Sequence, residues 1–257
     1  MKREVHIFFT AIMFYTRLPA PKWIGYHYQE QYLNEATKYF PFIGWVVAGF
    51  AAASFWGFQY ILPASISLLL SMVISILTTG AFHEDGFADV CDGFGGGWTK
   101  EKILTIMKDS RLGTYGSVGL VSILALKFTT LLEISSTAHL NVLVALFTAH
   151  AASRFFASIF IYTDRYVREN DDSKAKPIAK KLKVSHLLMG AIFGLSPAIY
   201  FFGLYSIAIF GAMLLSWLYL RRYFNKWIGG YTGDCLGAVQ QVTEIMAYLA
   251  ILVIYQL

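Results

Sequence analysis

Four carboxylates fall within nine residues at the end of an apolar run, in the segment Phe82-His83-Glu84-Asp85-Gly86-Phe87-Ala88-Asp89-Val90-Cys91-Asp92-Gly93. A helix turns by about 100° per residue, so Asp85, Asp89 and Asp92 would share one face and Glu84 would lie off it. Such a face suits Mg²⁺, which binds carboxylates and waters and shares its other positions with substrate phosphates. The spacing therefore predicts a site for a phosphorylated substrate.

A second cluster combines cationic side chains with glycines. It reads Lys108-Asp109-Ser110-Arg111-Leu112-Gly113-Thr114-Tyr115-Gly116. Lys108 and Arg111 have the charge and the donors to bind phosphate oxygens, and the two glycines let backbone approach a ligand closely. Taken alone, the same residues are equally typical of a charged helix end.

A third cluster, Gly229 to Ala238, places four glycines around Asp234 at the start of the last apolar run. The pattern indicates tightly packed backbone beside a carboxylate, although glycines of this kind also simply end and begin helices. About ten residues into that run stands Glu244, which is a functional candidate because acids in apolar spans are costly.

The composition places these clusters in a membrane protein. Of the 257 residues, 56% are hydrophobic and 14% are charged, well outside the usual balance of soluble domains. We expect a single integral membrane catalytic domain over residues 1–257, an all-α polytopic membrane helical bundle with about seven transmembrane helices. The runs long enough to cross about 30 Å of hydrocarbon are 41–62, 64–82, 116–134, 138–162, 187–202, 204–220 and 236–256. The first apolar stretch, Val5 to Tyr15, is too short and predicts an N-terminal interfacial helix.

Positive charge is distributed unevenly along the chain. All Lys and Arg residues except Lys127 and Arg154 lie in the segments 1–40, 83–115, 163–186 and 221–235. Two predicted spans separate each segment from the next, so all four would lie on one side, which the positive-inside rule assigns to the cytoplasm. Segment 163–186 would be a cytoplasmic loop or lid. Such one-sided charge suits anionic headgroups or a phosphate substrate and gives no reason to invoke nucleic acid.

The two basic residues within predicted spans should face the protein interior or a polar cavity. For Lys127 the simplest expectation is an ion pair with an acid, and Arg154 would reach a substrate phosphate. Arg17, near the membrane surface, would contact either substrate or lipid headgroups, and the sequence favours lipid.

The clusters occur in the order and wording of the bacterial cobalamin synthase family, also called adenosylcobinamide-GDP ribazoletransferase, and the chain closely resembles that family. The most specific sign is the acid motif followed about fifteen residues later by Met-Lys-Asp-Ser-Arg-Leu-Gly-Thr. The matching segments, which together span nearly the whole chain, are Phe14 to Pro19, Phe40 to Gly44, His83 to Gly93, Lys108 to Gly116, Ser153-Arg154 and Gly229 to Ala238.

The resemblance implies that adenosylcobinamide-GDP is joined to α-ribazole, or to α-ribazole 5′-phosphate, to give adenosylcobalamin or its 5′-phosphate, with release of GMP, at the final stage of cobalamin nucleotide loop assembly. It also implies Mg²⁺ as cofactor and the bacterial cytoplasmic (inner) membrane as location, with a cytoplasmic active face. Chemically the reaction is phosphoryl transfer, in which a ribose hydroxyl attacks the phosphorus bonded to the cobinamide arm.

In that reaction Asp85, Asp89 and Asp92 would hold one or two Mg²⁺ ions, and Asp234 would complete the metal ligands from the last helix. Glu84, off the shared face, would support these ligands from behind.

Phosphate oxygens and the attacking hydroxyl need further groups. The cations expected to bind phosphate oxygens are Lys108, Arg111 and Arg154. The candidates for the base that accepts the hydroxyl proton are His83, Asp92 and Asp109.

Other classes share parts of this pattern. The motif of a CDP-alcohol phosphotransferase begins in a similar way to Asp85-Gly86-Phe87-Ala88-Asp89, but it has Arg where this chain has Asp. An aspartate-rich prenyl transferase would need a second aspartate motif, which is missing here. A transporter with an acidic cation site would hold its acids within the spans, whereas these cluster at the cytoplasmic mouth. Membrane lipid is an expected partner; a homo-oligomer and contacts with other cobalamin-pathway enzymes are left open by the sequence.

Overall fold

The computed structural model describes residues 2–25, 29–168 and 182–257, so most of the predicted loop 163–186 lies outside the described residues. Within those ranges the chain is helical, and its one β pairing is an isolated parallel bridge between Tyr166 and Tyr231. The predicted all-α bundle is confirmed. The helices are α1 (Lys2–Tyr15), η1 (Lys22–Ile24), α2 (Glu30–Ala36), η2 (Thr37–Tyr39), α3 (Phe40–Phe58), α4 (Ala64–Thr79), α5 (Phe82–Gly96), α6 (Lys100–Ile106), α7 (Thr114–Thr137), α8 (His139–Thr163), α9 (Val184–Phe202), η3 (Gly203–Tyr205), α10 (Ser206–Ile228) and α11 (Gly233–Gln256).

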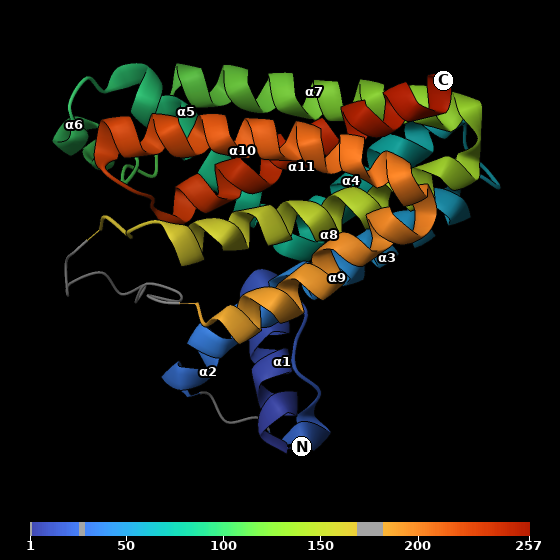
Figure 1. The fold of residues 1–257 in the computed structure, drawn as a ribbon. Coiled ribbons are helices and arrows are strands. Elements are labelled where there is room, and N and C mark those ends of the chain that lie inside the picture. The colour runs from blue at the N-terminus through green and yellow to red at the C-terminus, as the bar shows by residue number, and fades with distance from the viewer. Residues whose placement is uncertain (1, 26–28, 169–181) are drawn as a thin grey trace.

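The long apolar helices match the predicted runs. By length and composition, five segments of the described chain can cross a membrane, or six if α4 and α5 count together as one bent span. One of the five is the 45-residue stretch Val184–Ile228, which at about 1.5 Å per residue is twice the length that a bilayer needs. Figure 1 shows that α9 and α10 turn back on each other there, so the stretch holds two of the predicted spans. Helix α1, at 14 residues, is too short to cross, as the sequence predicted.

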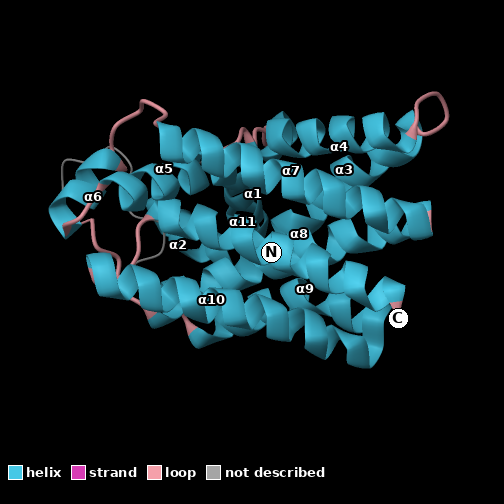
Figure 2. Cartoon of the chain, turned by 90° about the horizontal axis from the view of Figure 1, so that it is seen from above, coloured by secondary structure: helices cyan, strands magenta, loops and turns pink. Residues whose placement is uncertain are grey.

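Helices α8 and α11 form the centre of the bundle. Helix α11 packs against α5, α7, α8 and α10, and α8 packs against α3 and α9. Helices α3 and α8 approach closely at Gly44, which has no side chain: an added Cβ there would lie only 2.4 Å from the carbonyl oxygen of His150. Figure 2, seen from above, shows the long helices running in roughly the same direction through the molecule. Small residues at such crossings let membrane helices approach closely.

The ends of the bundle differ in content. At the left of Figure 1 lie α5, α6, the C-terminal ends of α8 and α10, and the N-terminal ends of α7 and α11. The turns between α7 and α8 and between α9 and α10, together with the C-terminus, lie at the right. The described basic residues after α6, after α8 and in the last turns of α10 therefore share one end of the molecule, as the charge pattern predicted for these three of its four segments.

A sharp bend between α4 and α5 directs the acid motif. The two helix axes meet at 89°, and the bend is made by Gly80 and Ala81, both with positive φ (67° and 58°). The backbone N–H of Arg17 donates to the carbonyl of Thr78 (2.8 Å), and its side chain occupies the space that a Cβ on Gly80 would need. Helix α5 thus turns aside and packs against α7 and α11.

Candidate active site

Glycines bring α5 and α11 together at the acid motif. A Cβ on Gly86 would lie 3.0 Å from the backbone of Asp234, and a Cβ on Gly237 would lie 3.0 Å from the carbonyl oxygen of His83. The first cluster and the third are therefore in direct contact. Helix α11 begins here because the Thr232 side chain accepts from the backbone N–H of Cys235 (3.3 Å).

Three carboxylates gather where these helices meet. Asp85 is exposed, whereas Asp89 and Asp234 are half-buried. The charges of Asp85 and Asp234 both act on Asp89, so the three groups lie close enough to repel one another. Like charges held together in this way favour the binding of a cation.

Asp92, the third acid of the predicted face, is engaged differently. Its two carboxylate oxygens accept backbone N–H groups of Gly113 (2.7 Å) and Gly116 (2.8 Å), at the N-terminus of α7. Such N–H groups have no partner within their own helix, and a carboxylate there also interacts favourably with the helix dipole. A Cβ on either glycine would lie 2.4 Å from an Asp92 oxygen. The close backbone approach expected of these glycines is thus made to Asp92, which ties the second cluster to the first.

The cationic residues of the second cluster lie on an exposed loop between α6 and α7. Arg111 Nε donates to both oxygens of Asp109 at 3.1 Å, and Arg111 Nη2 donates to Asp109 Oδ2 at 2.6 Å. The Arg111 side chain is 87% exposed. The hydrogen bonds from Arg111 lower the pKa of Asp109 to about 2. Such a carboxylate is a weak base, so this geometry does not favour Asp109 as the acceptor of a hydroxyl proton.

Oxygen donors at the α5–α11 contact match the needs of a hard divalent cation. Mg²⁺ is usually bound by one or two carboxylates, with waters and substrate phosphates completing its coordination. Asp85, Asp89 and Asp234 supply carboxylates of this kind. In the described ranges no three or more His, Cys, Asp or Glu side chains already form a cluster that could hold a metal ion. The carboxylates thus fit Mg²⁺ in chemical type but do not form a complete metal site by themselves, and a phosphate group would have to supply further ligands.

His83 and Glu84 point to the other side of α5, into the protein. His83 is 2% exposed and Glu84 is 8% exposed. His83 stacks on Phe40, with ring centroids 5.7 Å apart, and Glu84 accepts a hydrogen bond from Gln241 (3.1 Å). Burial keeps His83 away from the exposed acid face, so it is poorly placed to act as the base in this structure.

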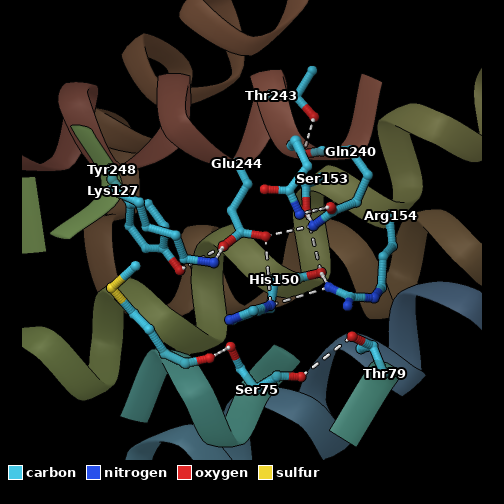
Figure 3. A network of polar contacts seen from close by, with 12 residues as sticks. Ser75, Thr79, Lys127, His150, Ser153, Arg154, Gln240, Thr243, Glu244 and Tyr248 are labelled. Carbon is cyan, nitrogen blue, oxygen red and sulfur yellow. Dashed lines mark hydrogen bonds and ion pairs between the residues drawn. The ribbon is translucent and has the colours of Figure 1, made fainter. Parts of the chain in front are cut away.

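Behind α5 lies the buried polar network of Figure 3, to which α4, α7, α8 and α11 contribute side chains. Lys127 forms an ion pair with Glu244, as expected for a lysine within a span. The Glu244 carboxylate also accepts hydrogen bonds from the Tyr248 hydroxyl (3.1 Å) and from the Gln240 amide. Its Oε2 lies 3.6 Å from His150 Nδ1. The acid singled out in the last span is thus neutralised within the bundle.

Arg154 belongs to this network and not to the surface. It is 1% exposed, donates to the carbonyl of His150 (2.8 Å), and lies over the Phe40 ring. A small cavity of about 10 Å³ lies beside it, roughly the space of one water molecule. Four residues that line this cavity each have one buried side-chain atom without a hydrogen-bond partner in the described chain: Arg154 Nε, Glu84 Oε2, His83 Nε2 and His150 Nε2.

The residue that sequence reasoning missed is Arg168. Its Nη2 donates to Asp234 Oδ2 (2.7 Å) and to the carbonyl of Met107 (3.2 Å). It stands in a basic segment that the charge pattern assigned to a loop, and nothing in its spacing distinguishes it from neighbouring cations. Only the fold reveals its partners.

The fold and the site together define a polytopic membrane protein with an acidic cluster at the mouth of its helical bundle, next to a loop of cationic residues. A family model described as Cobalamin-5-phosphate synthase matches residues 7–252. The chain belongs to this family, which confirms the resemblance seen in the motifs.

Curated relatives agree over nearly the full length. The chain is 46% identical to the adenosylcobinamide-GDP ribazoletransferase of Leptospira interrogans, with 98% of this chain and 97% of the relative covered. It is 44% identical to the protein of the same name from Shewanella frigidimarina, with 98% and 96% covered, and 42% identical to that of Shewanella oneidensis, with 98% and 95% covered. No solved structure matches the chain.

Proposed function

We propose that this chain is an adenosylcobinamide-GDP ribazoletransferase, which joins adenosylcobinamide-GDP to α-ribazole or its 5′-phosphate and releases GMP. The names of its relatives support this activity. The observation that carries the proposal is the meeting of all three sequence clusters at one end of the bundle. Asp92 binds the start of α7, Gly86 packs on Asp234, and Arg168 bridges Asp234 and Met107.

The chemistry needs a cation, and we assign its binding to Asp85, Asp89 and Asp234. Mg²⁺, when bound, would neutralise charge on the transferred phosphoryl group and on the departing GMP. The chain's own residues would position the reactants. Asp92 fixes the N-terminus of α7 against α5, so the loop that carries Lys108 and Arg111 stays beside the acid face. From there these cations would bind the non-bridging phosphate oxygens.

We place the protein in the bacterial cytoplasmic membrane with this end facing the cytoplasm. The concentration of basic segments at the same end of the bundle supports that orientation. Nucleotide-bearing substrates would then reach the acid face from the aqueous side, while lipid would surround the apolar outer faces of α7, α9 and α10.

The test is an assay of the purified chain in lipid nanodiscs with adenosylcobinamide-GDP and either α-ribazole or its 5′-phosphate. We expect GMP and the corresponding cobalamin product, both detected by mass spectrometry, and no GMP when the α-ribazole substrate is omitted. Folded protein that makes no cobalamin product would contradict the proposal. GMP formed without an acceptor would indicate hydrolysis instead of transfer.

A further inference from the structure

Arg168 contacts the acid face formed by Asp85, Asp89 and Asp234, and neither the cation site nor the phosphate-binding loop accounts for its presence there. Its guanidinium joins Asp234 of α11 to the carbonyl that follows α6. Its charge also acts on Asp89.

Backbone contacts hold Arg168 in place. The N–H of Tyr231 donates to the carbonyl of Arg165 and the N–H of Val167 donates to the carbonyl of Tyr231, both at 3.0 Å. This bridge lies directly before α11, so the same stretch of chain positions both Arg168 and Asp234. Gly230 (φ 154°) makes the bridge possible, because a Cβ there would lie 2.1 Å from the Arg165 carbonyl oxygen.

The Arg168 guanidinium has unused bonding capacity. Its side chain is 22% exposed, and its buried Nε has no hydrogen-bond partner in the part of the chain that is described. Its hydrogen bonds to Asp234 and to the Met107 carbonyl both use the same nitrogen, Nη2. A guanidinium offers five N–H donors in a planar fork that matches two oxygens of a phosphate group. Arg111, by contrast, already uses its fork on Asp109 and points into solvent.

We propose that Arg168 is a further diphosphate-binding residue of this site, beside the loop cations Lys108 and Arg111, and that it exchanges partners when substrate binds. In the substrate-free protein it neutralises Asp234. When a divalent cation takes Asp234, the guanidinium is released to the diphosphate that arrives with the cation. The inference rests on the proposed function for the identity of the nucleotide substrate, but the exchange itself can be measured without turnover.

The experiment measures binding to the full chain in nanodiscs. Mn²⁺ serves as the paramagnetic stand-in for Mg²⁺ and is titrated without nucleotide, and radiolabelled GDP is then titrated at saturating Mn²⁺. The variants are Arg168→Ala and Arg168→Lys. The matched control is Arg221→Ala, which breaks another Arg–Asp pair, to Asp164 (2.8 Å), at the start of the same stretch of chain. Thermal unfolding identifies any variant that has lost its fold, and Arg168→Lys keeps the test valid if the alanine variant has.

We expect Arg168→Ala to bind Mn²⁺ about threefold more tightly than the wild type, because Asp234 is freed. We also expect Arg168→Ala to bind GDP about tenfold more weakly than the wild type. The GDP affinity of Arg168→Lys should lie between those of the wild type and Arg168→Ala. Arg221→Ala should keep the wild-type affinity for both Mn²⁺ and GDP. Unchanged Mn²⁺ or GDP affinity in folded Arg168→Ala, or an equal GDP loss in Arg221→Ala, would overturn the proposal. Failure of the proposed function would look different, since wild type would bind Mn²⁺ and GDP yet make no cobalamin product.

Discussion

At the scale of single residues, the four-and-three spacing of the acid motif identifies the side chains that matter but not their partners. Asp85 and Asp89 remain available on the exposed side of α5, while Asp92 is bound to the start of α7. Spacing along a helix determines which residues share a face. It does not determine which neighbour packs against that face, and here a second helix terminus takes up one of the three carboxylates.

Asp92 should therefore matter for stability more than its neighbour does. Asp92→Asn would set an amide N–H₂ against a backbone N–H and should lower the free energy of unfolding by about 1–3 kcal/mol. Asp89→Asn removes a repelling charge and should leave stability unchanged or raised. Thermal unfolding in nanodiscs compares the two variants, and equal losses in both would contradict the capping role.

The pH dependence of activity should not reflect Asp109. Its pKa is about 2 because Arg111 hydrogen-bonds its carboxylate, whereas an unperturbed Asp has a pKa of about 3.9. Because the folded-state pKa is lowered, the stabilisation from this pair is complete above about pH 4 and is lost only as the pH falls towards 2. Asp109→Asn should thus leave the acidic limb of the pH–rate profile for GMP release in place. A displaced limb would identify Asp109 as a titrating base after all.

At the scale of elements, the sequence predicts the long helices well and the joints between them poorly. Each predicted apolar run corresponds to a helix of the structure, because the runs are long and strongly apolar. The 89° bend before α5 depends on Ala81 in a left-handed conformation. Alanine rarely adopts this conformation, so the sequence gives no sign that Ala81 does. The β-bridge between Tyr166 and Tyr231 joins residues far apart in the chain, so the local sequence pattern around either residue does not predict it.

Gly230 tests the joint that positions Arg168 and Asp234. Gly230→Ala would drive a Cβ into the Arg165 carbonyl and should lower stability by about 1–3 kcal/mol, with a loss of GDP binding. Gly211→Ala is the control, because nothing lies within 4 Å of the Cβ it adds to α10. The comparison requires unfolding midpoints and GDP affinities, and a Gly230→Ala variant that matches Gly211→Ala in both would refute the role of the bridge.

At the scale of the whole molecule, the bundle surrounds a charged network whose side chains are buried in the protein interior. The hydropathy of the spans predicts that Lys127 and Arg154 turn inward, and Lys127 pairs with an acid as expected. The expectation that Arg154 reaches a phosphate has no support in its buried position. Its partner His150 and the nearby glutamines, Gln240 and Gln241, could not be predicted, since neutral polar residues in spans give no charge signal.

The ion pair between Lys127 and Glu244 should stabilise the bundle only as a pair. Lys127→Met leaves Glu244 buried without its cation and should lower the free energy of unfolding by about 3–5 kcal/mol. Adding Glu244→Gln should recover part of the loss, because the uncompensated charge is gone. Unfolding in nanodiscs decides the matter; a double variant that is less stable than Lys127→Met would contradict this account of the network.

The central claim is that the carboxylates at the contact of α5 and α11 support a cation-dependent transfer that releases GMP. The most direct measurement is the rate of GMP release from adenosylcobinamide-GDP and α-ribazole 5′-phosphate as Mg²⁺ is titrated, for wild type, Asp89→Asn and the exposed control Glu101→Gln. We predict a Mg²⁺-dependent rate that EDTA abolishes, that Glu101→Gln retains, and that Asp89→Asn lowers by about a hundredfold or more. An EDTA-resistant rate, or an Asp89→Asn variant with the wild-type response to Mg²⁺, would contradict the claim.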